Sequence, residues 1–493
     1  MSSVIVIRRD IPFLDSAVMR MSEALALEFG ANVMSVVARQ APEKDLDESD
    51  SSSNFIYSLD SFRKIGLVRL SSDLMRSAWT AGLLSLAGKS GIKKFVETGQ
   101  VLSLPVEDIF YDSLIRTKNR FLRPHLHFLA MVKTLLEIRI VVRWFDKNLD
   151  SDLVEAVCLT TLQSREGKTM AMRAVQAGVP VFVVGGSGSL ARRHLTIESL
   201  QRSFYHLSAE EVDQVGDNDG WELDLDDYLT SRISPNAASF SSFRGDQMEN
   251  GNLRTLSEAN DEAPFRDKLV LSKASFIDEY IPANRQHLPL VVVFSHCFSD
   301  YPHSAGPLIF LDFYEALIET TRAIRQNKSV NWLIKPHPSR EFYGEEGLVE
   351  KMLAKNPSDN TFLWPETVST ASALDWASGI VTVNGTIGLE AACFGKPVLL
   401  AGSSAYGHLG FSKVAKTPTE FFSHIANAHS WTNIPQSQRL TARKALYLHA
   451  RLGSELPKSR GKARGLGGVN SVDYAQKVAL LANGEVDSLW LNR

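Results

Sequence analysis

The sequence predicts an α/β protein with two large domains, and three observations support this prediction. The chain has 493 residues, which is too many for a single hydrophobic core. Each half contains an apolar, β-branched strand that leads through a turn into a helix and then into a second strand, at 154–184 and at 379–400. Strands that alternate with helices in this way form parallel sheets covered by helices.

The first 209 residues are expected to form the N-terminal domain. Apolar periodicity predicts its elements, which are a strand at 4–7, a helix at 17–29, a strand at 33–37, a mainly helical region at 62–145, a strand at 154–160, a helix at 168–177 and a strand at 179–184. Gly178 follows the last helix, where glycine commonly ends a helix. An acidic, Ser-rich loop is expected at 41–54, and the Gly-Ser loop at 185–189 is a weak candidate for ligand contact.

Residues 210–270 are predicted to be a polar linker, because this stretch is first acidic and then rich in Ser, Asn and Gly. Its carboxylates are interpreted as solvated, since no buried strand precedes Asp217, Asp219, Asp224 or Asp226. The C-terminal domain is expected at 271–440, with strands at 289–294, 330–334, 379–383 and 397–400 and a helix at 387–394. The last part, 441–493, reads as helices separated by a basic, Gly-rich loop at 458–468.

Composition excludes several classes of protein. The 53 basic and 56 acidic residues give a net charge of -3, so no nucleic-acid partner is expected. No apolar run reaches eighteen residues, and the start of the chain has too short an apolar run for a signal peptide. We therefore expect a cytoplasmic protein whose membrane association, if any, is peripheral. Cys158, Cys297 and Cys393 lack metal-ligand spacing and are expected to be buried thiols.

Polar residues follow three predicted strands of the C-terminal half. Lys335 and His337 come after one strand, with two prolines stiffening the loop, and Asn384-Gly385-Thr386 begins the helix after another. A helix N-terminus presents unpaired N–H groups and a positive dipole end, which favour a phosphate. The candidate donor-binding residues are His296, Lys335, His337, Pro338, Ser339, Asn384, Gly385, Thr386 and Glu390. Glu390 is expected in the first turn, where it either binds ribose hydroxyls or complements the dipole.

These stretches resemble a known family. VVVFSHCFSDYPHSAG, WLIKPHPSR and TVNGTIGLEAACFGKPVLLAG look like the C-terminal half of bacterial capsule and surface polysaccharide glycosyltransferases, a group that includes the capsular Kdo transferases, which use CMP-Kdo. The resemblance is clearest over 288–412. It implies the GT-B fold, in which two Rossmann-like domains face each other across a cleft and a C-terminal helix crosses back, so 441–493 is expected to pack on the N-terminal domain.

The resemblance places the nucleotide-sugar in the C-terminal domain and the acceptor in the N-terminal one. VEDIFYDSLIRTKNR and SREGKTMAMRAVQAGVPVFVV carry a weaker similarity to the family's N-terminal half. The candidate proton acceptors there are Asp108, Asp112 and Glu166, and each is also explained as a structural or exposed carboxylate. His337 is the candidate for stabilising the charge that develops on the departing phosphate.

The expected function is therefore transfer of a sugar from a nucleotide-sugar substrate to a glycan or glycolipid acceptor, without a metal or other cofactor. Kdo from CMP-Kdo is the donor that the resemblance suggests, and a polysaccharide-assembly complex at the inner membrane is a possible partner. Two alternatives stay open, a CMP-activated polyol-phosphate (glycerophosphate-type) transferase and a non-catalytic polysaccharide-assembly protein.

Overall fold

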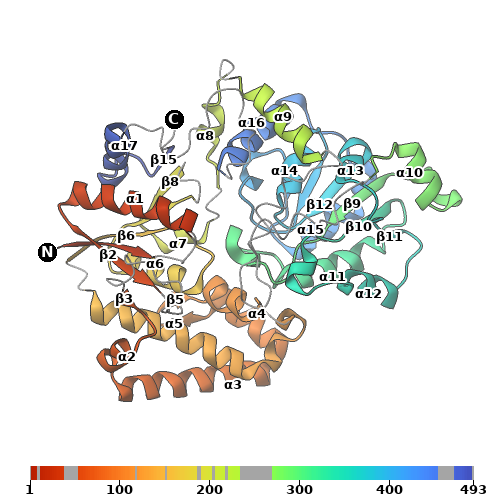
Figure 1. Cartoon of the computed structure of the whole chain (residues 1–493). Helices are drawn as coiled ribbons and strands as arrows, with labels where there is room; N and C mark the ends of the chain where they lie inside the picture. The colour runs from red at the N-terminus through yellow and green to blue at the C-terminus, as the bar shows by residue number, and fades with distance from the viewer. Residues whose placement is uncertain are drawn as a thin grey trace.

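The computed structural model describes residues 2–7, 12–37, 54–116, 119–149, 153–160, 162–185, 190–202, 206–216, 220–233, 269–452 and 471–490. These residues form an N-terminal and a C-terminal half, each with its own sheet (Figure 1). Five stretches on which predictions were made lie outside this described part, namely the loop up to 53, the Gly-Ser loop from 186 to 189, the acidic stretch at 217–219, the linker at 234–268 and the basic loop at 458–468.

The N-terminal sheet has the strand order β15-β8-β7-β6-β1-β2-β3. Its strands are β1 (Ser3–Ile7), β2 (Asn32–Val37), β3 (Asn54–Phe55), β6 (Val154–Leu159), β7 (Val181–Val184), β8 (Leu190–His194) and β15 (Ser488–Trp490). The central strands β3, β2, β1, β6 and β7 are parallel, and β8 and β15 are antiparallel additions at one edge. Strands β1, β6 and β7 are buried along most of their length because helices cover both faces, which explains their continuous apolar runs.

Helices α1 (Pro12–Phe29) and α17 (Ser471–Ala482) pack together and share a core with one face of this sheet (Figure 1). Helices α5 (Phe128–Asn148) and α6 (Arg165–Gln176) belong to the core on the other face, and α2 (Leu59–Ile65) and α3 (Leu67–Thr98) pack on α5. Ser164 caps α6 by accepting a hydrogen bond from the N–H of Gly167 over 3.1 Å. Gly178, at φ +80°, follows its end, as the sequence predicts.

The region at 62–145 is not helical throughout. A short hairpin of β4 (Gln100–Val101) and β5 (Leu104–Pro105) follows α3. Then comes a π-helix, η3 (Glu107–Asp112), which leads directly into α4 (Ser113–Ile115). The short 3₁₀ turns η4 (Arg120–Leu122) and η5 (Pro124–Leu126) precede α5.

The C-terminal sheet is entirely parallel, in the order β11-β10-β9-β12-β13-β14. Its strands are β9 (Leu290–Phe294), β10 (Asn331–Lys335), β11 (Thr361–Leu363), β12 (Gly379–Thr382), β13 (Val398–Leu400) and β14 (Lys413–Val414). The covering helices are α10 (Lys273–Tyr280), α11 (Phe313–Ile324), α12 (Leu348–Lys355), α13 (Thr370–Trp376), α14 (Thr386–Cys393) and α15 (Pro418–Ala426). The strands predicted from apolar runs are all present.

The chain crosses between the halves differently from the prediction. Residues 221–233 are not linker but form helix α9 (Trp221–Ile233), whose apolar side lies in the core of the C-terminal half beside α16 (Gln436–Leu452). Helix α16 packs on α14, so the expectation that all of 441–493 returns to the N-terminal half is wrong for α16. Among the described residues after 452, α17 and β15 do return, because α17 packs on α1 and β15 pairs with β8 (Figure 1).

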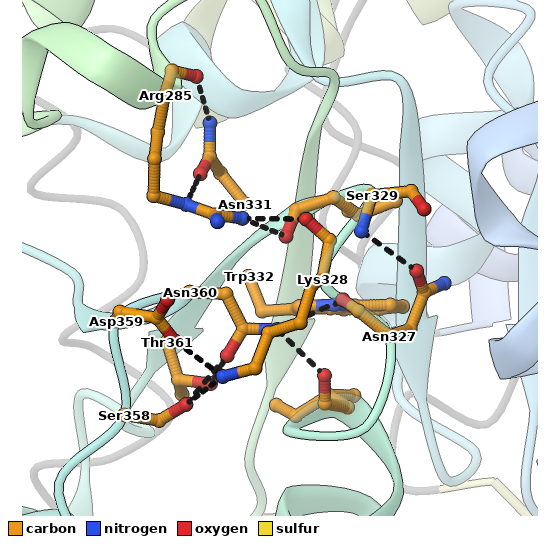
Figure 2. Close-up of polar contacts among 12 residues, drawn as sticks. Arg285, Asn327, Lys328, Ser329, Asn331, Trp332, Ser358, Asp359, Asn360 and Thr361 are labelled. Atoms are coloured by element: carbon orange, nitrogen blue, oxygen red, sulfur yellow. Dashed lines mark hydrogen bonds and ion pairs between the residues drawn. The ribbon is translucent and has the colours of Figure 1, made fainter.

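A buried polar network surrounds the amino-terminal end of β10 (Figure 2). Asn331 donates to the carbonyl of Arg285 and accepts from its Nε, both over 2.9 Å. Asn360 donates to the carbonyls of Ile324 and Asn327 over 2.9 and 2.8 Å. Both asparagine side chains are fully buried, and each amide finds hydrogen-bond partners on the backbone, as buried polar groups require. This polar cluster is at the opposite end of β10 from Lys335, so it is a structural feature.

Candidate active site

The loops with candidate ligand-binding residues meet at the carboxyl edge of the C-terminal sheet. Strands β10, β9 and β12 are parallel neighbours, so the loops that follow them leave the sheet at the same edge. His337 follows β10, His296 follows β9 and Asn384 follows β12. The backbone N–H of Asn384 donates to Nε2 of His296 over 3.4 Å, and Thr382 Oγ1 lies 3.1 Å from the same nitrogen. Open α/β sheets bind ligands at this edge.

His296 is a neutral, partly buried ring that holds the β12 loop. Its ring stacks on Phe313 with 4.1 Å between ring centroids. Burial lowers the pKa of His296 to about 4. Because Nε2 accepts the Asn384 N–H, the neutral ring carries its proton on Nδ1. His296 therefore positions the turn at Asn384 and brings no positive charge to a ligand at neutral pH.

His337 is oriented by its own loop and by the loop after β9. Its Nδ1 accepts from the N–H of Ser339 over 3.2 Å and lies 3.0 Å from Sγ of Cys297. Its backbone N–H donates to Oγ of Ser295 over 3.1 Å. With Nδ1 as acceptor, the neutral ring carries its proton on Nε2, which makes Nε2 a hydrogen-bond donor.

The N-terminus of α14 begins at a glycine without a side-chain cap. Gly385 is the N-cap residue, and the hydroxyl of Tyr406 donates to its carbonyl over 2.6 Å. A Cβ at this glycine would lie 3.1 Å from Thr382 Oγ1 and 3.2 Å from His296 Cε1, so the close approach of strand end and helix favours glycine. Thr386 is the first helical residue. The helix end thus presents backbone N–H groups beside Asn384, as an anion site requires.

Ser339 has a buried hydroxyl that no hydrogen bond satisfies within the described part of the chain. Ser339 is 4% exposed, and its Oγ has no hydrogen-bond partner among the described residues. Ser339 lies two residues after His337, and its backbone N–H donates to Nδ1 of that ring. A buried hydroxyl without a partner costs free energy, and a ligand atom at this strand edge would remove that cost.

For the remaining donor-side candidates, which are Lys335, Pro338 and Glu390, the structure shows fewer contacts with the loops at this edge. Lys335 is 8% exposed, and its Nζ lies 5.3 Å from the centre of the Trp364 ring, where a cation is stabilised by the π system. Pro338 is exposed. Glu390 is not in the first turn of α14, since the helix begins at Thr386 and its first turn contains no acidic residue. The account of Glu390 as a partner of the helix dipole is therefore wrong, and its binding of ribose stays a prediction.

Asp108 and Asp112 line a hollow between the two halves. The hollow is bounded on the N-terminal side by η3, by the loop before α6 and by α6, and on the other side by Tyr301 and Ser304. The wide i to i+5 turn of a π-helix places residues four to five apart on one side, which brings both carboxylates to the hollow. Asp108 forms an ion pair with Lys168 through Oδ2, and its Oδ1, also buried, has no hydrogen-bond partner among the described residues.

Asp112 is instead committed to a contact across the halves. Its carboxylate accepts from the backbone N–H of His303 over 3.0 Å and contacts Nδ1 of His303 over 2.7 Å. Burial alone would lower the pKa of His303, but the adjacent Asp112 carboxylate raises it to about 8. At neutral pH the two therefore form a buried, charge-assisted pair. This pairing leaves Asp112 poorly placed to accept a substrate proton.

Glu166 is also occupied by its neighbours. Arg165 forms an ion pair with it, and the hydroxyl of Tyr57 donates to Oε1 over 3.1 Å. Burial would raise the pKa of Glu166, but the Arg165 guanidinium outweighs it and holds that pKa below its usual value. Among the three predicted carboxylates, the structure thus leaves Asp108 as the one with an unsatisfied oxygen at the hollow.

Sequence reasoning missed the residues that dock the two halves and hold the β9 loop. Besides His303, the hydroxyl of Tyr111 donates to Asp312 over 2.5 Å, and both residues are fully buried. Glu345, 1% exposed, accepts from the backbone N–H groups of Phe298 and Ser299 over 2.7 and 2.9 Å. No sequence pattern pairs these residues, because the partners are separated by 46 to 201 positions.

The structure also bears on metals, thiols and membrane spans. Within the described residues, no group of three or more His, Cys, Asp or Glu side chains is placed to hold a metal ion. The three cysteines are buried thiols, as predicted. No helix in the described ranges is both long and apolar enough to cross a membrane.

Two Rossmann-like halves that meet at a hollow define a protein of the GT-B class. Residues 275–434, about a third of the chain, match the family model described as "Capsule polysaccharide biosynthesis protein". This match confirms, for that region, the resemblance to capsule polysaccharide biosynthesis proteins. A comparison with curated protein sequences finds no match.

Several solved structures are loosely similar to the whole fold. One is Thermosulfurimonas dismutans KpsC, a beta Kdo 2,4 transferase, at 14% identity and a TM-score of 0.31, with 59% of this chain and 80% of that chain covered. Another is MnaA of S. aureus with UDP, at 12% identity and a TM-score of 0.26, with 98% and 97% covered. A third is UDP-GlcNAc 2-epimerase from Neisseria meningitidis, at 10% identity and a TM-score of 0.24, with 92% and 100% covered. At such TM-scores these likenesses carry no information about ligand or activity.

Proposed function

We propose that the protein is a glycosyltransferase of capsule or surface polysaccharide biosynthesis that transfers a sugar from a nucleotide-sugar to a glycan or glycolipid acceptor. The observation that carries this proposal is the convergence of His337, the Ser339 hydroxyl and the uncapped start of α14 on one strand edge. These groups are hydrogen-bond donors, and donors are what a departing nucleotide phosphate needs.

In this proposal the phosphate lies between the β10 loop and the N-terminus of α14. The Nε2 proton of His337, the Ser339 hydroxyl and backbone N–H groups near Asn384 and Thr386 donate to the phosphate oxygens. Their positions are fixed before the reaction by Cys297, Ser295 and His296, so they stabilise the developing charge without reorganising. The set supplies donors from the protein alone, and we propose that transfer requires no metal ion.

The acceptor enters the hollow between the halves in this proposal. Asp108 accepts the proton of the attacking hydroxyl through its unsatisfied Oδ1, while Lys168 holds Oδ2. Tyr301 and Ser304 on the facing side lie on the loop after β9, which also carries His296. One loop therefore connects the acceptor hollow to the donor crevice.

We further propose CMP-Kdo as the first donor to test, because the resemblance over 288–412 includes the Kdo transferases of capsule assembly. The test is a thermal-shift panel with CMP, UDP, GDP and ADP, followed by incubation of the selected nucleotide-sugar with glycan acceptors. A ligand that binds only the native state raises the melting temperature. We expect one nucleotide to stabilise the protein and the product to contain a glycosidic bond, with or without EDTA.

Other results would refute parts of this proposal. A phosphodiester product would identify the polyol-phosphate transferase instead. Stabilisation by no nucleotide, together with no product, would favour the non-catalytic assembly protein. Turnover that is lost in EDTA and restored by magnesium or manganese would contradict a metal-independent site.

A further inference from the structure

Helix α3 has an exposed apolar face on the outside of the N-terminal half. Its exposed large apolar side chains include Val68 at 87%, Met75 at 67%, Trp79 at 72% and Leu86 at 88%. They are spaced by seven, four and seven residues, so they lie along one stripe of the helix. The buried residues of α3 include Ser77 and Leu84, on the opposite side, where α3 packs on α5.

More apolar side chains are exposed just beyond this helix. Leu126 of η5 is 60% exposed, and Leu129 at the start of α5 is 79% exposed. The turn η5 packs against α3, so Leu126 belongs to a neighbour of this helix. In Figure 1, α3 runs along the outer edge of the N-terminal half, with α5 between it and the sheet. The name "α3 face" is used below for Val68, Met75, Trp79 and Leu86.

The charges of the elements around the α3 face are mostly positive. Residues 59–98 and 119–148, which span α2, α3 and α5, contain thirteen Lys and Arg but five Asp and Glu, among them Asp73, whereas the chain as a whole has a net charge of -3. Asp73 is 2% exposed and is paired with Arg139 and Arg143 of α5, so it adds no negative charge to the surface. Arg69 and Arg76 are exposed and follow Val68 and Met75 directly, which places them along the same flank of the stripe.

We infer that the α3 face docks the protein on an anionic phospholipid surface. A helix with exposed Trp and Leu on one stripe and cations beside it matches the chemistry of an interface between acyl chains and anionic headgroups. Pairing of this face with a second copy would bring two cationic surfaces together, which like charges oppose. This inference deepens the proposed function, because a docked enzyme meets a glycolipid acceptor in the plane of the membrane.

The position of the face relative to the hollow fits this role. Helices α3 and α5 both contact η3, which carries Asp108 and Asp112. The docking surface and the wall of the acceptor hollow are therefore parts of one packed unit. Lys89 and Lys93, which follow the kink of α3 at Gly88, pair with Glu315 of the C-terminal half over 3.1 and 3.5 Å, so the segment after the stripe also contacts that half.

The test is flotation of the full chain with vesicles of phosphatidylcholine alone or mixed with phosphatidylglycerol. We expect binding to the mixed vesicles only, and release at high salt, because the Debye length shrinks from about 10 Å at 0.1 M to about 3 Å at 1 M. Trp79→Ser with Leu86→Ser, and separately Arg69→Gln with Arg76→Gln, should each weaken binding about tenfold or more. These side chains are exposed, so their replacement leaves the core intact.

Matched controls exist in the same chain. Leu27 of α1 is 81% exposed, so Leu27→Ser controls for loss of an exposed apolar side chain. Lys351 and Lys355 of α12 are exposed, so Lys351→Gln with Lys355→Gln controls for loss of two charges. We expect the control variants to bind vesicles as the unaltered chain does.

Three outcomes would overturn the inference. They are no binding to anionic vesicles, binding that the α3 variants leave unchanged, and an α3 face that governs only self-association in sedimentation equilibrium. Vesicle binding is measured without nucleotide or acceptor, so its failure is distinguishable from failure of glycosyl transfer, which the nucleotide panel and product analysis report separately.

Discussion

At the scale of single residues, His296 and His337 have different roles although both follow a parallel strand of the C-terminal sheet. Asn384 donates its N–H to His296, which makes that ring a support for the β12 loop. Ser339 donates its N–H to Nδ1 of His337, which turns the Nε2 proton into a donor. The sequence indicates both residues because each follows an apolar run. The tautomers depend on which backbone group each ring faces, and that arises only when the sheet has formed.

Replacement of His337 separates its two roles. In His337→Asn the amide oxygen takes the place of Nδ1 and still accepts from Ser339, but the Nε2 donor is lost. We expect turnover to fall about a hundred- to thousandfold, the typical cost of one preformed donor to developing charge, and the same for His337→Ala. His337→Gln, which puts a donor near the Nε2 position, should restore part of the rate. Steady-state kinetics and melting curves on the same samples are the measurement, and near-normal turnover of a folded His337→Asn would remove His337 from the site.

Variants of the two candidate carboxylates Asp108 and Glu166 should differ in turnover in the same assay. Asp108→Asn removes the proton acceptor at the hollow, so turnover should fall about a hundred- to ten-thousandfold while nucleotide affinity is kept. Glu166→Gln is the matched control. The Glu166 carboxylate already has Arg165 and Tyr57 as partners, so we do not expect it to accept the substrate proton. If Glu166→Gln loses turnover and Asp108→Asn does not, the assignment of the proton acceptor is wrong.

At the scale of elements, the sequence predicts strands well and irregular helices poorly. The apolar runs before Ser295, Pro336 and Val383 each form a buried strand, and the parallel order brings their ends together. The π-helix η3 could not be predicted, since its i to i+5 bonding depends on packing against α3, α5 and α6. A π-helix is frequent at functional sites, and here it brings Asp108 and Asp112 to the same hollow.

The network at the amino end of β10 (Figure 2) should affect stability without affecting the ligand site. Asn360→Ala removes two buried hydrogen bonds, one of the two donors to each of the carbonyls of Ile324 and Asn327, which should lower the free energy of unfolding by about 1 to 3 kcal/mol. Its neighbour Asp359 has a side chain that is 67% exposed and pairs with Lys328, so Asp359→Ala should change little. Urea unfolding with nucleotide titration tests both. Loss of nucleotide affinity in a folded Asn360→Ala would show that this network is not purely structural.

The contact between η3 and the loop after β9 should make stability depend on pH. The pKa of His303 rises from 6.5 to about 8 in the folded chain, which corresponds to about 2 kcal/mol. A raised pKa means that this stabilisation is complete below about pH 6.5 and is lost as the pH rises through 8. We expect the melting temperature to fall across this window. His303→Gln should flatten that fall, and an unchanged pH profile in the variant would exclude His303 as its source.

At the scale of the whole molecule, the division into two sheet-centred halves follows from chain length and alternation of elements. The way in which the two halves dock does not follow from the sequence, because the contacts pair residues that are far apart along the chain, such as Tyr111 with Asp312 and Asp112 with His303. Helix α9 was also predicted to be linker. The acidic residues before and within this helix outweighed the apolar side formed by Trp221, Leu225 and Tyr228 in the sequence pattern. An amphipathic helix rich in Asp resembles a solvated segment until its partner, α16, is known.

The central claim is that a nucleotide-sugar binds at the carboxyl edge of the C-terminal sheet. Isothermal titration of the stabilising nucleotide into the unaltered chain and into Ser339→Ala, with Asn360→Ala as the control at the other end of β10, tests it most directly. The account predicts that Ser339→Ala weakens binding by about 0.5 to 1.5 kcal/mol, roughly two- to twelvefold, and that Asn360→Ala binds normally. Equal affinity in the unaltered chain and in Ser339→Ala, or binding by no nucleotide at all, would contradict it.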